Sequence, residues 1–539
     1  MKHFTLIIFL IGAQLSYSQN FEWAESFGGL STEQAISVVT DPNDQSIYLT
    51  GFFFSEFDGI PGTPNSNTVA VDATDLFLIK LDAQGDFVWM ITVGGLDNQS
   101  GMGLIIDENQ NILMLARESP NTSVYKFDAN GSFVWYYVSG YANSTSPESI
   151  SLDSEGNVYV SGTFSDTVDF DNSVVADELI AQGNEDAFIL KLDTDGEYIW
   201  SKSIGGPSGG AIGKEISINS EDDIILSGFF HGTVDFDPNA GNENFTAFGS
   251  TDIFTTKLDS AGNHIWTMQT GGSLSNQVTG ITLDGDDNIY STGHFEGSMD
   301  ADPSTNAEFL NTNGNFDFFV QKLNTDGEYL WAIGYGGMQY DIAKGICLDD
   351  DGEIYVTGNF GAAMDFDPGT EIYSLDAGVA DDGFILKCSN DGDFIWARQI
   401  EGIDAFNTGI DIHVDIDENI LVVGEYMGQT DFDPNSSDHY ISSIDILDVF
   451  ILKLNQDHSG IENIKEESYS IFPNPSQGVL SVEGEYQESG ILYTLDGKVI
   501  ETFIISEGKI NLEHIDKGMY FLVIESSPGH LSSKKIVIE

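Results

Sequence analysis

Cysteine is almost absent from this sequence, which holds two among 539 residues. A disulfide framework is therefore excluded, and a repeated apolar core must supply the stability. We expect Cys347 and Cys388 to be free thiols. They fall on strands that one other strand separates, which puts their α-carbons about 9 to 10 Å apart, too far for a bridge.

Basic residues are also scarce, with 19 Lys and Arg against 87 Asp and Glu and a formal net charge of −68. A surface this acidic repels nucleic acid and anionic lipid, so we expect neither as a partner. It favours divalent cations or a salty medium, because unscreened self-repulsion destabilises a compact chain.

Long apolar segments are missing beyond the N-terminus. Residues 1–18 carry a basic start, an apolar run and a small-residue end, which is typical of a secretory signal peptide cleaved between Ser18 and Gln19. No cysteine follows the run, which argues against a lipoprotein anchor. No other stretch reaches the ~18 apolar residues of a membrane span, so we expect no transmembrane anchor in the mature chain.

A sustained helical period is absent too, and a much longer repeat takes its place. The tryptophans are spaced by 66, 46, 65, 66, 65 and 65 residues, and one lysine per unit keeps the same period. These residues are Trp23, Trp89, Trp135, Trp200, Trp266, Trp331 and Trp396, with Lys80, Lys126, Lys191, Lys257, Lys322, Lys387 and Lys453. Each unit holds four short segments rich in β-branched and aromatic residues and bounded by Gly, Asp or Asn. The sequence therefore predicts an all-β, seven-bladed β-propeller over residues 19–461.

The two ends of the repeat region are incomplete in complementary ways. Trp23 precedes the first unit, and the last unit lacks a tryptophan. We expect the N-terminal strand to complete the seventh blade, which makes the Trp strands outermost. Tight turns such as 284–288 then share one face, while glycine-led and Asp-x-Asp loops share the other, where binding is expected. The second unit lacks the Asp-x-Asp segment, which predicts a notch over blade two.

Aspartates separated by one residue recur in the long loops. The pairs are Asp169 and Asp171, Asp235 and Asp237, Asp300 and Asp302, Asp365 and Asp367, and Asp431 and Asp433. In an extended segment the two carboxylates lie on one side about 7 Å apart, an arrangement that suits calcium. We favour the alternative, in which one Asp accepts backbone N–H groups in an Asx turn and the other pairs with a lysine. No segment supplies a full calcium loop with its bidentate Glu. No cofactor is required, and calcium is the one candidate.

Catalytic patterns are weak. The segment 206–210 matches Gly-x-Ser-x-Gly but occupies an inter-blade loop rather than a strand-turn-helix. No His-Glu-x-x-His motif occurs. We expect the repeat lysines to pair with buried carboxylates, because an unpaired buried ammonium is very costly. The sequence therefore predicts a protein that is not an enzyme.

A different module follows a polar linker over residues 462–468. Residues 469–539 alternate short strands with Pro-Asn-Pro and Asp-Gly turns, which predicts a small β-sandwich. Its motif residues, in chain order, are Pro473, Asn474, Pro475, Gly478, Gly497, Gly518, Lys534 and Lys535. Together they resemble the type A C-terminal sorting domain of the type IX secretion system of Bacteroidota. The resemblance implies export by that machinery, removal of the domain, and either release or attachment to the cell surface.

The repeats themselves resemble the bacterial seven-bladed propeller repeat, SBBP, through Asp-Phe-Asp-Pro, Asp-x-Phe-x-x-Lys-Leu-Asp and Gly-x-x-x-Trp segments. That fold hosts both binders and enzymes. We expect a secreted or surface-attached binding or adhesion module for an extracellular protein or glycan. The alternatives are a secreted polysaccharide hydrolase or lyase that uses long-loop carboxylates, and a structural component of a surface layer.

Overall fold

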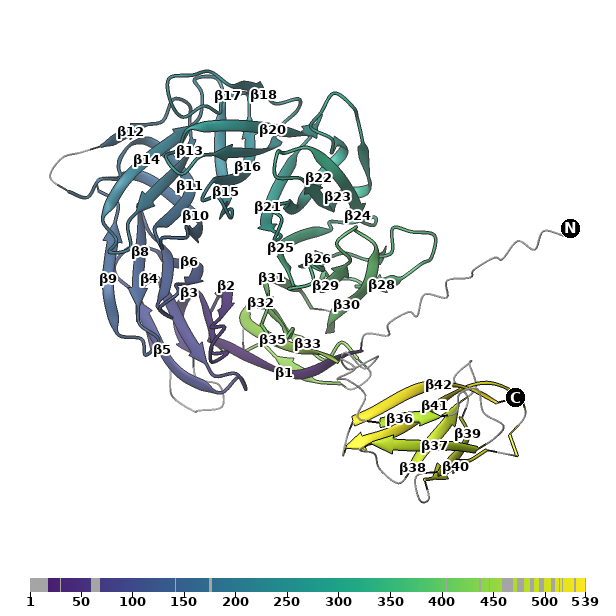
Figure 1. Ribbon diagram of the computed structural model, residues 1–539. Helices are drawn as coiled ribbons and strands as arrows, with labels where there is room; N and C mark the ends of the chain where they lie inside the picture. The colour runs from purple at the N-terminus through teal and green to yellow at the C-terminus, as the bar shows by residue number, and fades with distance from the viewer. Residues whose placement is uncertain are drawn as a thin grey trace, which may run out of the picture. The chain divides into compact units, whose positions relative to one another are not determined.

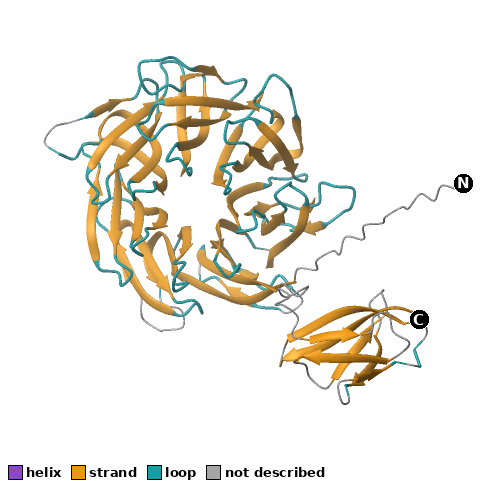
Figure 2. Cartoon of the chain, viewed as in Figure 1, coloured by secondary structure: helices purple, strands orange, loops and turns teal. Residues whose placement is uncertain are grey.

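The computed structural model describes residues 18–29, 31–59, 68–140, 142–173, 177–403, 405–435, 438–444 and 446–457, and in the C-terminal region 469–472, 479–484, 489–493, 499–505, 509–512, 514–515, 517–527 and 530–538. The regular structure in these ranges is β-strand, as predicted (Figure 2). No helix in the described ranges is long and apolar enough to cross a membrane. One compact unit spans Gln19–Gln456, and a second contains Asp457–Glu539.

The larger unit consists of antiparallel meanders of four strands around a common axis (Figure 1). The first meanders are β2 (Glu33–Thr40), β3 (Ile47–Asp58), β4 (Thr68–Leu81) and β5 (Phe87–Val93); β6 (Gln99–Ile106), β7 (Ile112–Glu118), β8 (Asn121–Phe127) and β9 (Phe133–Val138); β10 (Ala142–Leu152), β11 (Val158–Asp169), β13 (Asp186–Leu192) and β14 (Tyr198–Ile204); and β15 (Gly210–Ile218), β16 (Ile224–His231), β19 (Asp252–Leu258) and β20 (His264–Gly272). The others are β21 (Asn276–Leu283), β22 (Ile289–Asp300), β23 (Phe309–Leu323) and β24 (Tyr329–Tyr335); β25 (Ile342–Leu348), β26 (Ile354–Phe360), β29 (Asp382–Cys388) and β30 (Phe394–Ile403); and β31 (Asn407–Val414), β32 (Ile420–Tyr426) and β35 (Asp448–Asp457) with β1 (Ser18–Gly29).

Short extra strands lie in the long loops of several sheets. They are β12 (Glu178–Ile180), β17 (Thr233–Asp235), β18 (Asn244–Thr246), β27 (Ala363–Asp365), β28 (Ser374–Asp376), β33 (Gln429–Asp431) and β34 (Tyr440–Ser442). The antiparallel order places the tight turns at one end of the meanders and these loops at the other. Ser119 and Pro120 alone join β7 to β8, so the predicted notch is confirmed.

The ring closes through the N-terminal strand. β1 hydrogen-bonds to β35 and becomes the outer strand of the last sheet, as the position of Trp23 predicts. The inner strands contact one another in the order β2, β6, β10, β15, β21, β25, β31 and back to β2. The first and last repeats of the chain are therefore neighbours.

Glycine pairs end two of the outer strands and join them to the next sheet. Gly28 and Gly29 of β1 pair with Asp58 and Phe57 of β3, and β20 pairs with β22 in the same way. A Cβ added at Gly29 would lie 1.6 Å from the Glu56 carbonyl oxygen. Only glycine allows this backbone approach, which explains the glycine-led loops of the sequence.

The core of this unit lies between adjacent sheets. Residues of β11 and β13 pack against residues of β15, β16 and β19, including Ile189, Phe230 and Phe254. Every residue of β13 and β19 is buried. Cys347 on β25 and Cys388 on β29 are free, with β26 between them, which confirms the expected thiols.

The C-terminal unit contains two small sheets. One consists of β36 (Tyr469–Phe472), β37 (Val479–Gly484) and β40 (Lys509–Asn511), and the other of β38 (Ser489–Tyr493), β39 (Val499–Ile504), β41 (Gly518–Ser527) and β42 (His530–Ile538). Buried Leu480, Leu492, Ile510, Leu522 and Ile536 come from both sheets and form one cluster. This is the sandwich arrangement that the alternating strands predict.

Candidate functional site

The aspartate pairs of the long loops form Asx turns. Asp235 Oδ1 accepts the N–H groups of Asp237 at 3.2 Å and Glu243 at 2.7 Å. Asp237 Oδ1 accepts the N–H of Asn239 at 2.9 Å. The same bonds recur at Asp169 and Asp171, Asp300 and Asp302, Asp365 and Asp367, and Asp431 and Asp433. Both carboxylates of each pair therefore fix the backbone of their own loop.

These bonds confirm the Asx turns but correct the partner expected for the second aspartate. Backbone N–H groups bind that carboxylate, and the repeat lysines contact other aspartates, so the predicted lysine pairing of the loops is wrong. Among the described residues, no group of three or more His, Cys, Asp or Glu side chains is placed to hold a metal ion. Calcium binding by these loops stays a prediction.

The repeat lysines are buried and make ion pairs and hydrogen bonds within and between the sheets. Lys191 lies opposite Tyr159 on one side and Trp200 on the other, and its Nζ is 3.2 Å from Asp153 Oδ2. The other pairs are Lys80–Asp44 at 4.0 Å, Lys126–Asp107 at 2.8 Å, Lys257–Asp223 at 3.1 Å, Lys322–Asp284 at 3.7 Å, Lys387–Asp349 at 3.5 Å and Lys453–Asp415 at 3.3 Å. Most of these lysines also donate to a turn of the next sheet, as Lys80 does to the Ala129 carbonyl at 3.0 Å. The predicted pairing with buried carboxylates is confirmed except at Lys80, whose partner Asp44 is 56% exposed, and the lysines are structural.

One sheet reverses the two turn residues that serve the lysine. Asn219 there accepts the N–H groups of Glu221 and Asp223, the role that aspartate has elsewhere. Asp223 supplies the carboxylate for Lys257. In the usual order, burial acts to raise the pKa of Asp107, but hydrogen bonds from Lys126 and Asn111 outweigh it and the pKa is lowered. The exchange keeps one carboxylate beside the buried ammonium, as its charge requires.

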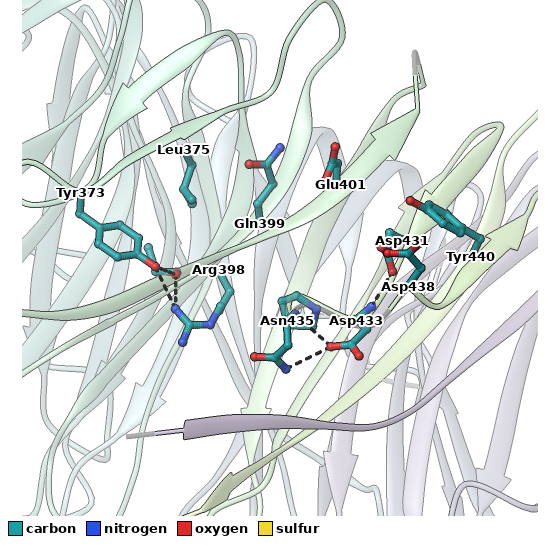
Figure 3. A pocket seen from close by; sticks show the side chains of 12 residues that line it. Tyr373, Leu375, Arg398, Gln399, Glu401, Asp431, Asp433, Asn435, Asp438 and Tyr440 are labelled. Carbon is teal, nitrogen blue, oxygen red and sulfur yellow. Dashed lines mark hydrogen bonds between the residues drawn. The ribbon is translucent and has the colours of Figure 1, made fainter. Parts of the chain in front are cut away.

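A cavity of about 500 Å³ opens between two neighbouring sheets on the long-loop side. Strands β28 and β30 form one wall, and the loop between β33 and β34 forms the other (Figure 3). β30 pairs with β33 through Glu401 and Asp431, so the two walls share a hydrogen-bonded base. The cavity holds Asp431 and Asp433, two of the ten aspartates singled out in the sequence.

The first wall is a fixed aromatic and cationic surface. Arg398 Nη1 donates to the Tyr373 hydroxyl at 3.0 Å and to the Ala397 carbonyl at 2.8 Å. The guanidinium lies over the Trp396 ring, 5.5 Å from its centroid, and the Tyr373 ring packs on Phe394. Arg398 is therefore held by hydrogen bonds and by a cation–π contact, with little freedom left to lose on binding.

The second wall is acidic and carries an exposed ring. Asp431 and Asp433 are each 8% exposed, whereas the Tyr440 ring is 45% exposed. Partial burial and the carboxylates of Asp438 and Asp431 raise the pKa of Tyr440. The N-terminal strand supports this wall, because the Phe21 ring lies 4.7 Å from the His439 ring.

The cavity offers hydrogen-bond donors and acceptors side by side. Arg398, Gln399 and Asn435 carry N–H groups, and Glu401, Asp433 and Asp438 carry carboxylate oxygens. Four carboxylates face one guanidinium, so the lining is negative. A ligand that both donates and accepts hydrogen bonds fits this lining, and an anionic ligand does not.

Buried aspartates elsewhere have strongly shifted pKa values but do not line this cavity. Burial raises the pKa of Asp317 to about 7, with a contribution from Asp341, against a hydrogen bond from the Asn313 N–H. Burial likewise raises the pKa of Asp382 to about 7, and its Oδ1 accepts from the N–H of Gly402 at 2.9 Å. These carboxylates hold the backbone of the inter-sheet loops.

Sequence inspection identified part of this site and missed the rest. It singled out Asp431 and Asp433 but not Arg398, Tyr373 or Tyr440. One signal was available: Arg398 is one of two arginines in the chain and stands outside the lysine repeat. The tyrosines lie in the variable loops of two different units, where the repeat gives no guidance.

Several predicted residues lie outside the described ranges. These are the apolar part of the signal peptide and Pro473, Asn474, Pro475, Gly478 and Gly497. Ser18 and Gln19 fall in β1, and the larger compact unit begins at Gln19. Gly518 begins β41, and Lys534 and Lys535 lie within β42. Cleavage between Ser18 and Gln19 stays a prediction.

Comparison with known proteins gives three kinds of match: curated relatives, solved structures and a family model. A WD repeat-containing protein, L264, of Acanthamoeba polyphaga mimivirus is 24% identical over 273 residues, which is 44% of this chain and 19% of that protein. The regulatory protein FlaEY of Caulobacter vibrioides is 24% identical over 218 residues, which is 39% of this chain and 22% of that protein. The chain thus spans about a fifth of the length of these curated relatives.

Solved structures match at low similarity. The Pan2 WD40 domain of Neurospora crassa has 9% identity and a TM-score of 0.39, with 77% of this chain and 88% of that chain covered. A virginiamycin B lyase from Staphylococcus aureus has 9% identity and a TM-score of 0.41, with 82% and 99% covered.

A family model matches the C-terminal region from the second residue of β36 onward. Residues 470–539 match the model of the secretion system C-terminal sorting domain, the module expected from the Pro-Asn-Pro, Gly-x-Tyr and Lys-Lys motifs. Such a domain directs its host protein to be exported from the cell. The chain therefore carries a secretion sorting domain, and the match indicates secretion and attachment to the cell surface.

Proposed function

We propose that this protein is a secreted, seven-bladed propeller of the SBBP type that binds a neutral saccharide at the cell surface, in the cavity between β30 and the β33–β34 loop. The observation that carries this proposal is the lining of that cavity. A hydroxyl is both donor and acceptor, and the cavity presents N–H groups and carboxylates side by side between two tyrosine rings. Its negative charge disfavours acidic sugars.

The blade number is supported by the strand pairings. Each meander corresponds to one tryptophan and one lysine of the sequence, and the inner strands form a closed series of contacts. The propeller fold suggests a binding or scaffold module, and the type IX machinery is the partner that its sorting domain implies. A seven-unit ring with one strand donated by the N-terminus accounts for all of these features.

Binding without chemistry is supported by the state of the carboxylates. Asp431 and Asp433 are committed to the N–H groups of their own loop, as in the other sheets. A glycosidase needs two carboxyl groups in unlike environments that share one scissile bond. We propose that these aspartates shape the cavity and that saccharide binding ends in release of the unchanged sugar.

The test is a glycan panel scored for both binding and product formation with the mature protein. Tyr440→Ala removes the exposed ring, and Arg398→Gln removes the cationic wall. Each is expected to weaken binding by about tenfold. Tyr340→Ala is the matched control, because Tyr340 is 48% exposed on the loop of another sheet.

Three outcomes contradict the proposal. Release of shortened glycans would identify a hydrolase or lyase. Binding that Tyr440→Ala and Tyr340→Ala affect equally would place the ligand elsewhere. Self-assembly of the protein without any glycan binding would favour the structural surface-layer alternative.

A further inference from the structure

Every innermost strand of the ring carries a β-bulge at the same place. The register shifts occur between Ala35 and Ser37, Gly101 and Gly103, Pro147 and Ser149, Gly213 and Glu215, Val278 and Gly280, Ala343 and Gly345, and Gly409 and Asp411. A bulge leaves one residue unpaired and redirects its side chain. The bulged residues are Ile36, Met102, Glu148, Lys214, Thr279, Lys344 and Ile410.

Two of the basic residues that do not belong to the lysine repeat occupy these bulges. Outside the repeat lysines, the basic residues of the propeller are Arg117, Lys202, Lys214, Lys344 and Arg398. Lys214 and Lys344 are bulged, and Arg117 is the next-to-last residue of β7, beside the notch. In a chain with a net charge of −68, this grouping on and beside the inner strands is not explained by overall composition.

Arg117 and Lys214 both contact the carboxylate of Glu148, which lies on the sheet between theirs. Lys214 Nζ hydrogen-bonds to Glu148 Oε2, and Arg117 Nη2 lies 3.7 Å from Glu148 Oε1. Arg117 Nη2 also donates to Ser146 Oγ, which in turn bonds Glu148 at 3.1 Å. Two cations therefore share the Glu148 carboxylate.

Both cations remain accessible while the carboxylate between them is covered. The side chains of Arg117 and Lys214 are each 34% exposed, and that of Glu148 is 14% exposed. Only the Ser119–Pro120 turn follows Arg117, where other sheets have a long loop.

The geometry points to a second binding site at this notch, in which Arg117 and Lys214 take the carboxylate group of a small acidic ligand. A guanidinium matches a carboxylate with two parallel hydrogen bonds, and the neighbouring ammonium adds a third charged contact. This ligand differs in charge from the one expected in the cavity beside Tyr440, so the two sites are independent.

Isothermal titration of the mature, full-length protein at low ionic strength tests this site, with D-glucuronate as the probe and D-glucose as the uncharged control. Arg117→Gln and Lys214→Gln are each expected to weaken glucuronate binding by about tenfold, the effect of losing one charged hydrogen bond. Lys202→Gln is the matched control, because Lys202 donates to Asn239 on another sheet. Arg117→Lys keeps the charge and serves if the Gln variant does not fold.

Glu148→Gln gives the decisive measurement, because it removes the competing carboxylate while keeping the size of the side chain. Glucuronate binding is expected to tighten in this variant, whereas a purely structural ion-pair cluster predicts lower stability and no binding. The proposal is overturned if the wild type does not bind glucuronate, or if Arg117→Gln and Lys214→Gln bind it as tightly as the wild type; glucose binding that both variants retain belongs to the cavity beside Tyr440. Binding that appears only in Glu148→Gln also overturns it, because the natural carboxylate then fills the site.

Discussion

Two junctions between neighbouring sheets differ in the chain connections that hold them. The closing junction joins the sheet of β31, β32, β35 and β1 to that of β2–β5, and polar side chains cross it. Asp411 Oδ2 accepts the Val38 N–H at 2.9 Å, and Thr40 Oγ1 lies 2.8 Å from His413 Nε2. Further bonds run from Gln34 to Glu425 at 3.0 Å and from Gln45 to Asp417 at 2.5 Å.

The junction compared with it joins the sheet of β6–β9 to that of β10–β14. We call it the cavity junction because it contains an opening, which is separate from the cavity beside Tyr440. An opening of about 280 Å³ remains there among Ile105, Glu108, Lys126 and Leu152. Side-chain bonds across it include Thr122 to Thr145 at 3.0 Å and Trp135 to the Thr194 carbonyl at 3.0 Å.

The difference follows from chain connectivity. The short segment from β9 to β10 links the sheets of the cavity junction covalently, so imperfect packing costs little entropy there. In the closing junction only β1 is linked to the first sheet through the chain, whereas β31, β32 and β35 come from the opposite end of the propeller and reach that sheet through non-covalent contacts. Specific hydrogen bonds at that place select the correct neighbour and are expected to dominate the stability of the ring.

Deleting residues 21–26 is expected to have the largest effect, because it removes most of β1 and with it the closure of the ring. The last sheet then loses its outer strand and exposes an edge. We expect loss of cooperative unfolding or aggregation, followed by calorimetry and light scattering. A monomeric deletion variant with an unchanged melting temperature contradicts the role of β1.

Lys387→Met tests what all junctions have in common. Lys387 is 1% exposed and binds Asp349 and Glu353, so its loss leaves buried charge without a counter-ion. We expect about 3 kcal/mol less free energy of unfolding in denaturant titrations. Lys202→Met, at an exposed ammonium, is the control and is expected to change little.

Asp411→Ala separates the two junctions directly. It leaves the Val38 N–H of the closing junction without its acceptor and is expected to lower the free energy of unfolding by about 2 kcal/mol. Glu108→Ala, on the exposed rim of the cavity junction, is expected to change it by less than about 0.5 kcal/mol. Equal effects of the two variants would show that closure has no special energetic weight.

His413 makes the stability of the closing junction depend on pH, and His413→Gln is expected to remove that dependence. Burial lowers the pKa of His413 to about 4. Between about pH 6.5, the usual histidine value, and pH 4 the unfolded chain gains a proton that the folded chain does not, so the wild type loses stability as pH falls through this window. Burial raises the pKa of Asp411 to about 6, which acts in the opposite direction but is present in both proteins.

The variant is therefore expected to match the wild type at pH 7 and to exceed it by on the order of 2 kcal/mol near pH 4. Denaturant titrations at half-unit steps measure the difference. A constant offset at all pH values would mean that His413 titrates equally in both states.

Calcium gives the smallest expected effect. The closing sheet carries Asp431 and Asp433, and the sheet of β6–β9 carries no such pair. Because these carboxylates already bind backbone N–H groups, we expect calcium to raise the melting temperature no more than sodium does at the same ionic strength. A calcium-specific rise that a chelator reverses would instead support the metal sites, with about 2.7 kcal/mol per site at a hundredfold excess over Kd.

The regular part of this fold could be predicted from the sequence, because each tryptophan and lysine marks one unit. Lys191 lies between Tyr159 and Trp200 as a repeated element must. The binding cavity could not be predicted in the same way. Arg398 and Tyr440 belong to different units, and only their meeting at a shared base makes a site. The bulges of the inner strands leave no trace in a hydrophobic pattern, so the convergence of Arg117 and Lys214 was also hidden.

The strand β1 has a consequence for the order of events during export. Glu22 of β1 contacts Asn455 of β35, 433 positions further along the sequence. The first strand of the propeller therefore cannot pair with its partner until the last strand of the propeller has been synthesised. Until then the chain holds an unfinished ring with open edges, and closing such a distant contact is slow. Only a short linker separates the sorting domain from β35, so the chain completes its propeller and its export label at nearly the same moment. A secretion route that must handle this chain before closure therefore has the whole period of synthesis in which to do so.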